Sequence, residues 1–144
     1  MFARDVMSHP VLTFRLHTPA RVAAAQLVSR GFVGAPVMTA EGVVLGIVTE
    51  TDLLRGQVLA ATSRTRPDPA PDTTVAEVMS PAPFVIKPDD DLTDVVELML
   101  TRSVRSVPII DDGHLVGIVS RRDVLRSMAR RELMQQGRGR ECRP

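Results

Sequence analysis

Apolar positions along the chain alternate between short continuous runs and helical spacings, in an order that occurs twice. In the first half, a β-prone run at 11–14 precedes an amphipathic stretch that Thr18 caps, Pro19 opens and Gly31 ends. Two further apolar runs, separated by a turn that contains glycine, indicate neighbouring strands. A second helix is expected to begin near Thr49. The pattern predicts a β-α-β-β-α unit whose small sheet is covered by helices.

The second half repeats this pattern element by element. Its first strand is predicted at 84–86, and its first helix begins within 89–91. A strand led by Pro108 and another at 115–119 follow, and the last helix is predicted over 121–136. The apolar side of that helix, which favours packing against a partner subunit over membrane binding, comprises Val124, Leu125, Met128, Leu133 and Met134.

The similarity of the two halves extends to residue identity. Asp5-Val-Met-Ser8 recurs as Glu77-Val-Met-Ser80, 72 residues later. After a one-residue deletion, residues 45–55 align with 116–126 at an offset of 71, and six of the eleven pairs are identical. Two copies are too few for a solenoid and favour a pair about a pseudo-two-fold axis. The two repeated units are predicted at 1–60 and 75–136. A Pro-rich linker at 61–74 joins them, and a flexible tail follows at 137–144.

These repeated segments resemble CBS domains, the cystathionine-β-synthase-type domains that occur in tandem. The resemblance rests on Val-Met-Ser at the start of each copy and on the strands led by Pro36 and Pro108. It rests further on the signatures Gly-Ile-Val-Thr-Glu-Thr-Asp (46–52) and Gly-Ile-Val-Ser-Arg-Arg-Asp (117–123). It implies an α/β fold of two packed units that usually dimerises. It also implies clefts that bind adenosine-containing ligands such as AMP, ADP, ATP or S-adenosylmethionine.

Each signature places a hydroxyl and a carboxylate three residues apart at a strand-to-helix junction. The carboxylates of Asp52 and Asp123 can accept two hydrogen bonds from a ribose diol. The hydroxyls of Thr49 and Ser120, with the free N–H groups of the first helical turn, can bind a phosphate. The same spacing is also that of a capping box, a purely structural device. Because the short side chain of Asp is expected to fit that box less well than Glu, the repeated pattern favours ligand contact.

Arginines make the two signatures chemically unequal. Arg121 and Arg122 stand in the first turn of a helix, where cations oppose the helix dipole unless an anion binds beside them. The first copy has Glu50 and Thr51 at these positions. A phosphorylated ligand is therefore expected at Ser120 and Asp123, unless the arginines are merely solvated. Further expected ligand contacts are Arg105 and strand residues that the resemblance implies, namely Thr13, Ala35, Pro36, Val85, Val107 and Pro108.

Composition limits the possible partners. The chain has 144 residues, 44% of them apolar, and its longest apolar runs are too short to span a bilayer. A net charge of +1, without Trp or Tyr, argues against nucleic-acid binding. The single cysteine excludes a disulfide framework, and three scattered histidines give no metal-ligand spacing. Together with the lack of an apolar leader, these features predict a cytoplasmic protein that needs no metal and no obligatory cofactor.

Two functions remain open from the sequence. No Ser/His/Asp or Cys/His arrangement appears, so catalysis is not expected. The first reading is a non-enzymatic sensor of an adenine nucleotide or adenosyl ligand, acting as a homodimer on a separate effector protein. The alternative is a structural or interaction module with empty pockets, whose function is carried by its dimer and partner surfaces.

Overall fold

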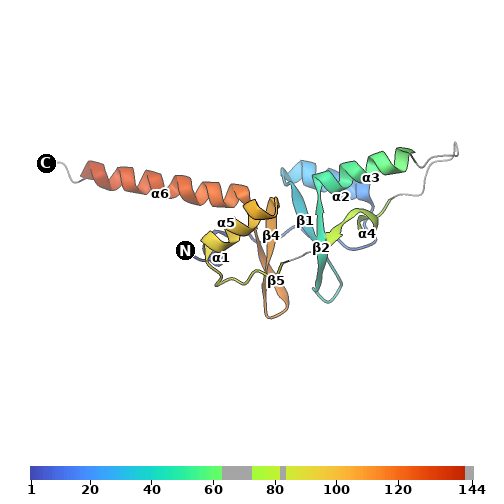
Figure 1. Cartoon of the computed structure of the whole chain (residues 1–144), viewed down its shortest axis with the longest axis horizontal. Coiled ribbons are helices and arrows are strands. Elements are labelled where there is room, and N and C mark those ends of the chain that lie inside the picture. Colours follow the sequence, from blue (N-terminus) through green and yellow to red (C-terminus); the bar gives the residue numbers. More distant parts are fainter. Residues whose placement is uncertain (63–72, 82–83, 142–144) are drawn as a thin grey trace.

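The computed structural model describes residues 1–62, 73–81 and 84–141, so most of the predicted linker lies outside the described residues. The fold mixes helices with antiparallel strands in two halves, as predicted (Figure 1). In the first half, β1 (Gly34–Met38) pairs with β2 (Val44–Thr49); β2 also pairs with the short β3 (Ser80–Pro81), which comes from the start of the second repeat. In the second half, β4 (Ser106–Asp111) pairs with β5 (His114–Ser120).

The long helices begin and end close to the positions that the sequence predicts. Gly31 ends its helix with a left-handed φ of 67°, as expected from its position, and Asp91 caps another by accepting a 2.8 Å hydrogen bond from the Thr93 N–H. That bond lowers the pKa of the Asp91 carboxyl. Thr18 is not the N-cap that was predicted, because its hydroxyl accepts from the Arg15 N–H instead. These helices are α2 (Ala20–Arg30), α3 (Glu50–Thr62), α5 (Leu92–Thr101) and α6 (Arg121–Glu141).

The predicted strands at 11–14 and 84–86 are not strands. Each segment makes one parallel bridge, from Phe14 to Val37 and from Ile86 to Ile109. Phe14 and Ile86 are buried at these points, so one side chain anchors each segment to the sheet edge. The β-propensity of the short runs therefore reflects a single buried contact and not a paired ladder.

Each repeat begins with a four-residue helix that was not predicted. These helices are α1 (Ala3–Val6) and α4 (Val75–Val78). An acidic side chain at the third helical position caps the N-terminus of each helix. Asp5 accepts from the Phe2 N–H at 2.7 Å, and Glu77 accepts from the Thr74 N–H at 2.9 Å. Helices this short show no apolar periodicity in the sequence.

Each of these short helices packs into the core of the opposite half. Ala3 of α1 is fully buried among second-half residues that include Val95 and Ile109. Val75 of α4 is fully buried among first-half residues that include Leu27 and Val37. The two hydrophobic cores therefore interlock the copies, and neither copy contains all of its own core.

Helix α6 extends well beyond the body of the molecule (Figure 1). It continues to Glu141, beyond the predicted end at residue 136, so the backbone of 137–141 is helical and not a frayed tail. Val124 packs against the core of the second half. In the part of the chain that the structure describes, no helix is long and apolar enough to cross a membrane.

A candidate ligand cleft between the repeats

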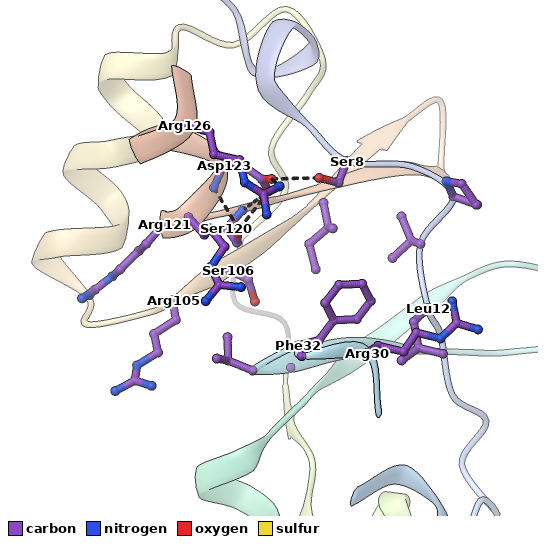
Figure 2. Close-up of a pocket in the computed structure, with 17 residues that line it drawn as sticks. Ser8, Leu12, Arg30, Phe32, Arg105, Ser106, Ser120, Arg121, Asp123 and Arg126 are labelled. Carbon is purple, nitrogen blue, oxygen red and sulfur yellow. Dashed lines mark hydrogen bonds and ion pairs between the residues drawn. The ribbon is translucent and has the colours of Figure 1, made fainter. Parts of the chain in front are cut away.

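A cavity of about 330 Å³ lies between the two halves, beside the N-terminus of α6 (Figure 2). The first half contributes the segment from Ser8 to Leu12 and the loop at 30–34, which joins α2 to β1. The second half contributes the start of β4 and the junction of β5 with α6. The apolar side chains that line the cavity are those of Pro10, Val11, Leu12, Phe32, Val33 and Ile118.

Asp123 is the most heavily hydrogen-bonded side chain of this cavity. It is 8% exposed, and its Oδ2 accepts from the N–H of Ser120 at 2.8 Å and from the Ser120 hydroxyl at 2.9 Å. Its Oδ1 accepts from the Ser8 hydroxyl at 2.8 Å. Asp123 thus connects the start of α6 to the lead segment of the first half.

The same network occurs at the junction of β2 with α3. Asp52 Oδ2 accepts from the Thr49 N–H at 2.9 Å and from its hydroxyl at 3.0 Å, while Asp52 Oδ1 accepts from the Ser80 hydroxyl at 3.0 Å. The expectation that Asp fits a capping box poorly is therefore wrong, because its carboxylate reaches the N-cap N–H in both copies. Capping and ligand contact are not exclusive, since a carboxylate offers more acceptor sites than these bonds occupy.

Two of the predicted anion contacts already have partners within the chain. Arg121 donates from Nε to the carbonyl oxygen of Val104 at 3.1 Å and from Nη2 to that of Met99 at 3.3 Å. Its guanidinium therefore stabilises the C-terminal end of α5, where carbonyl groups lack helical partners. Arg105 forms a 3.0 Å ion pair with Glu50, which joins the second half to the start of α3 in the first half.

The cavity brings together only part of the predicted site. Five predicted residues line it, namely Arg105, Ser120, Arg121, Arg122 and Asp123. Thr49 and Asp52 form the equivalent junction of the other copy. The remaining six do not line this cavity: Ala35, Pro36, Val107 and Pro108 are buried strand residues, Thr13 is half-buried, and Val85 is 69% exposed.

Twelve of the 17 lining residues were not predicted from the sequence, and three of these, Arg30, Phe32 and Ser106, carry side chains that matter for ligand binding. The Phe32 ring projects into the middle of the cavity from the loop before β1 (Figure 2), and Arg30 lines the cavity from the end of α2. The match of Arg30 with Arg102 in the repeat was a signal for one of them. Nothing local marked Phe32 or Ser106, because they reach the cavity only through the packing of the halves.

A model of the CBS domain family matches residues 3–58 and again 75–130. The chain belongs to the CBS domain family. These two matches contain both hairpins and both junctions described above, so the cavity lies within a CBS pair. CBS domain pairs are generally regulatory, non-catalytic modules. In the described part of this CBS pair, no group of three or more His, Cys, Asp or Glu side chains is placed to hold a metal ion.

Known CBS proteins resemble this chain in sequence and fold. YhcV of Bacillus subtilis is 35% identical over 101 residues, which cover 70% of this chain and 67% of YhcV. The structure of CBSX2 of Arabidopsis thaliana in complex with AMP has a TM-score of 0.74 and 26% identity, covering 91% of this chain and 98% of that one. The CBS pair of MJ0100, with 5′-methylthioadenosine and S-adenosyl-L-methionine, has a TM-score of 0.75 and 23% identity, covering 91% and 98%.

The extent of these likenesses differs between relatives. This chain spans between 14% and 91% of the length of the curated proteins that it matches. The likeness to MJ0100, at 23% identity, shows a shared fold. The CBSX2 structure has a nearly equal TM-score of 0.74 and a slightly higher sequence identity of 26%.

Proposed function

We propose that this CBS pair is a non-enzymatic sensor that binds a phosphorylated adenosine ligand in the cavity beside Ser120 and Asp123. One observation carries the proposal: a single cavity combines an apolar wall, a hydroxyl–carboxylate pair and cationic side chains at a helix N-terminus. The apolar wall suits an adenine ring, the hydroxyl–carboxylate pair suits a ribose, and the cationic helix N-terminus suits a phosphate. The AMP complex of CBSX2 supports the same assignment.

The proposed contacts divide between the halves of the CBS pair. Phe32 and Leu12, from the first half, pack against the base, while Asp123 accepts one further hydrogen bond from the ribose. The N–H and the side chain of Arg122 bind phosphate, because the N–H groups of Arg121 and Asp123 already donate to the Arg105 carbonyl oxygen and to the Ser120 hydroxyl. A ligand held in this way joins the two halves and stabilises the assembled pair in proportion to its saturation. This linkage is the means by which the sensor transmits occupancy to a separate effector protein.

The equivalent junction at Thr49 and Asp52 is a poorer anion site. Glu50 stands where the second copy has Arg121, and its carboxylate forms the ion pair with Arg105. A phosphate there meets a negative charge and competes for a cation that is already paired. We therefore expect one phosphorylated nucleotide per chain.

Calorimetric titration of the intact chain with AMP, ADP, ATP and S-adenosylmethionine tests the proposal. We expect saturable binding of at least one phosphorylated nucleotide with a stoichiometry near one per chain. Glu50→Gln is expected to leave nucleotide binding at least as tight, because Glu50 does not line the cavity and its loss frees Arg105, which does. Failure of all these ligands to bind would contradict the proposal and favour the interaction module with empty pockets.

We further propose that the sensor is a homodimer that forms through its helices, and that it acts in the cytoplasm. Large apolar side chains are exposed at repeat-equivalent positions on these helices, namely Val28 with Leu100 and Leu54 with Leu125. Exposed acidic residues on α5, Asp94 and Glu97, complement the arginines of α6. A second copy brings both kinds of surface to the contact, which favours a self-complementary interface.

The dimer is tested by placing a charge on this helix face. Leu125→Asp is expected to convert a dimer into a monomer, because Leu125 is 63% exposed in the single chain and a buried carboxylate at the interface is costly. Val85→Asp is the matched control, since Val85 is 69% exposed and lies outside the helices. Sedimentation equilibrium measures the molecular mass in solution of the unaltered chain and of both variants. A monomeric unaltered chain, or equal masses for the unaltered chain and Leu125→Asp, would contradict the dimer.

A further inference from the structure

Ser106 is a nearly buried residue whose hydroxyl oxygen is accessible from the cavity and has no partner among the described residues. It is 7% exposed and lines the cavity (Figure 2). It pairs directly with Ser120 across the β4–β5 ladder. Side chains at such paired positions lie close together, so the free hydroxyl is next to the N-terminus of α6. A hydroxyl that opens into a cavity with its donor and acceptor sites unused is available to a ligand in that cavity.

Two arginines of the same cavity also lack partners. Arg121 and Arg105 are engaged as described, and Arg126 lies 4.0 Å from Asp123 Oδ1. In the described part of the chain, neither Arg30 nor Arg122 has a hydrogen bond or an ion pair. Arg30 comes from the end of α2 in the first half and Arg122 from the first turn of α6 in the second. The two free cations therefore reach the cavity from different halves.

The positive charge is concentrated at this cavity. Five arginines and one carboxylate line it, whereas the whole chain has a net charge of +1. The other junction lacks this set, because Gly34 replaces Ser106 and Thr51 replaces Arg122 at the equivalent positions. An excess of cations over carboxylates, with two of the arginines unpaired, favours a ligand with several negative charges.

We propose that Arg30, Ser106 and Arg122 form a polyphosphate subsite that makes the CBS pair select nucleoside di- and triphosphates. This inference rests on the proposed function and specifies its ligand. A phosphate chain that begins beside Ser120 and Ser106 can extend to guanidinium groups of both halves, which bind phosphate bidentately. A monophosphate is too short to reach the guanidinium groups of both Arg30 and Arg122. The same arginines repel the positively charged sulfonium of S-adenosylmethionine.

Equilibrium titrations with AMP, ADP and ATP, in buffer without divalent cations, test the subsite. We expect ATP to bind at least tenfold more tightly than AMP, with ADP between them. Arg30→Gln and Ser106→Ala are each expected to reduce that ratio about fivefold or more, mainly by weakening ATP. Arg130→Gln is the matched control, because it removes the same charge from an exposed position of α6 outside the cavity and should leave the ratio unchanged.

The outcomes separate the subsite from the proposed function. If AMP binds as tightly as ATP, or if Arg30→Gln and Arg130→Gln weaken ATP equally, the polyphosphate subsite is wrong while nucleotide binding stands. If no nucleotide binds the unaltered chain, both the proposed function and this inference are wrong.

Discussion

A protein consisting of residues 74–144 alone is expected not to fold cooperatively. Its core would lack Ala3 and the rest of α1, which fill the space beside Val95 and Ile109 in the intact chain. Its own first helix would present Val75, fully buried in the intact chain, to water. A core in a domain of about 70 residues rarely contributes more than about 3–5 kcal/mol, so these losses exceed what the fragment can tolerate.

Circular dichroism and amide NMR of the fragment measure this effect. We expect a broad thermal transition and poorly dispersed amide signals, together with aggregation through the exposed sheet. Co-expression with residues 1–62 is the control, because it restores α1 and the opposite core and should recover a sharp transition. A sharp, cooperative melt of residues 74–144 as a monomer would contradict the interlocked cores.

Asp123→Ala is expected to weaken both the fold and nucleotide binding. The variant loses three accepted hydrogen bonds at an almost buried carboxylate, and it leaves the Ser8 hydroxyl and the Ser120 N–H without their partner. Removing such a partner costs about 1–3 kcal/mol of unfolding free energy. Loss of the charge-assisted bond to a ribose adds a reduction in nucleotide affinity of about tenfold or more.

Asp52→Ala separates the two effects, because Asp52 makes the same set of hydrogen bonds at the other junction. We expect the two variants to lower the apo melting temperature by similar amounts, since their capping losses are alike. Only Asp123→Ala should reduce the affinity for the nucleotide. Thermal melts of the apo proteins and titration at a temperature where both variants are folded provide the comparison. Equal affinities for the two variants would mean that Asp123 is only a helix cap.

The repeat made the hairpins and the long helices predictable. Glycine turns, the Gly31 terminus and the cap at Asp91 are local signals, and each acts within a few residues of the element that it bounds. The short helices α1 and α4 were missed for the opposite reason. Burial of Ala3 and Val75 is decided by the other half of the chain, and a four-residue helix carries no periodic pattern.

The candidate site was predictable from the sequence only where its residues belong to one local motif. Ser120 and Asp123 belong to one local motif, so the sequence located their junction correctly. The role of Arg121 was not predictable, because its acceptors are carbonyl oxygens at the end of α5, far away in sequence. Phe32 and Ser106 likewise become neighbours of that junction only when the halves pack together.

Fluorescence of Phe32→Trp tests the central claim, that an adenine nucleotide binds between the halves beside Ser120 and Asp123. The chain contains no Trp and no Tyr, so the new indole reports on this cavity alone. We predict a saturable change in its emission on titration with ATP, at one nucleotide per chain. In the same background, Asp123→Ala is expected to reduce the affinity for ATP about tenfold or more. An emission that AMP, ADP and ATP all leave unchanged would contradict the account.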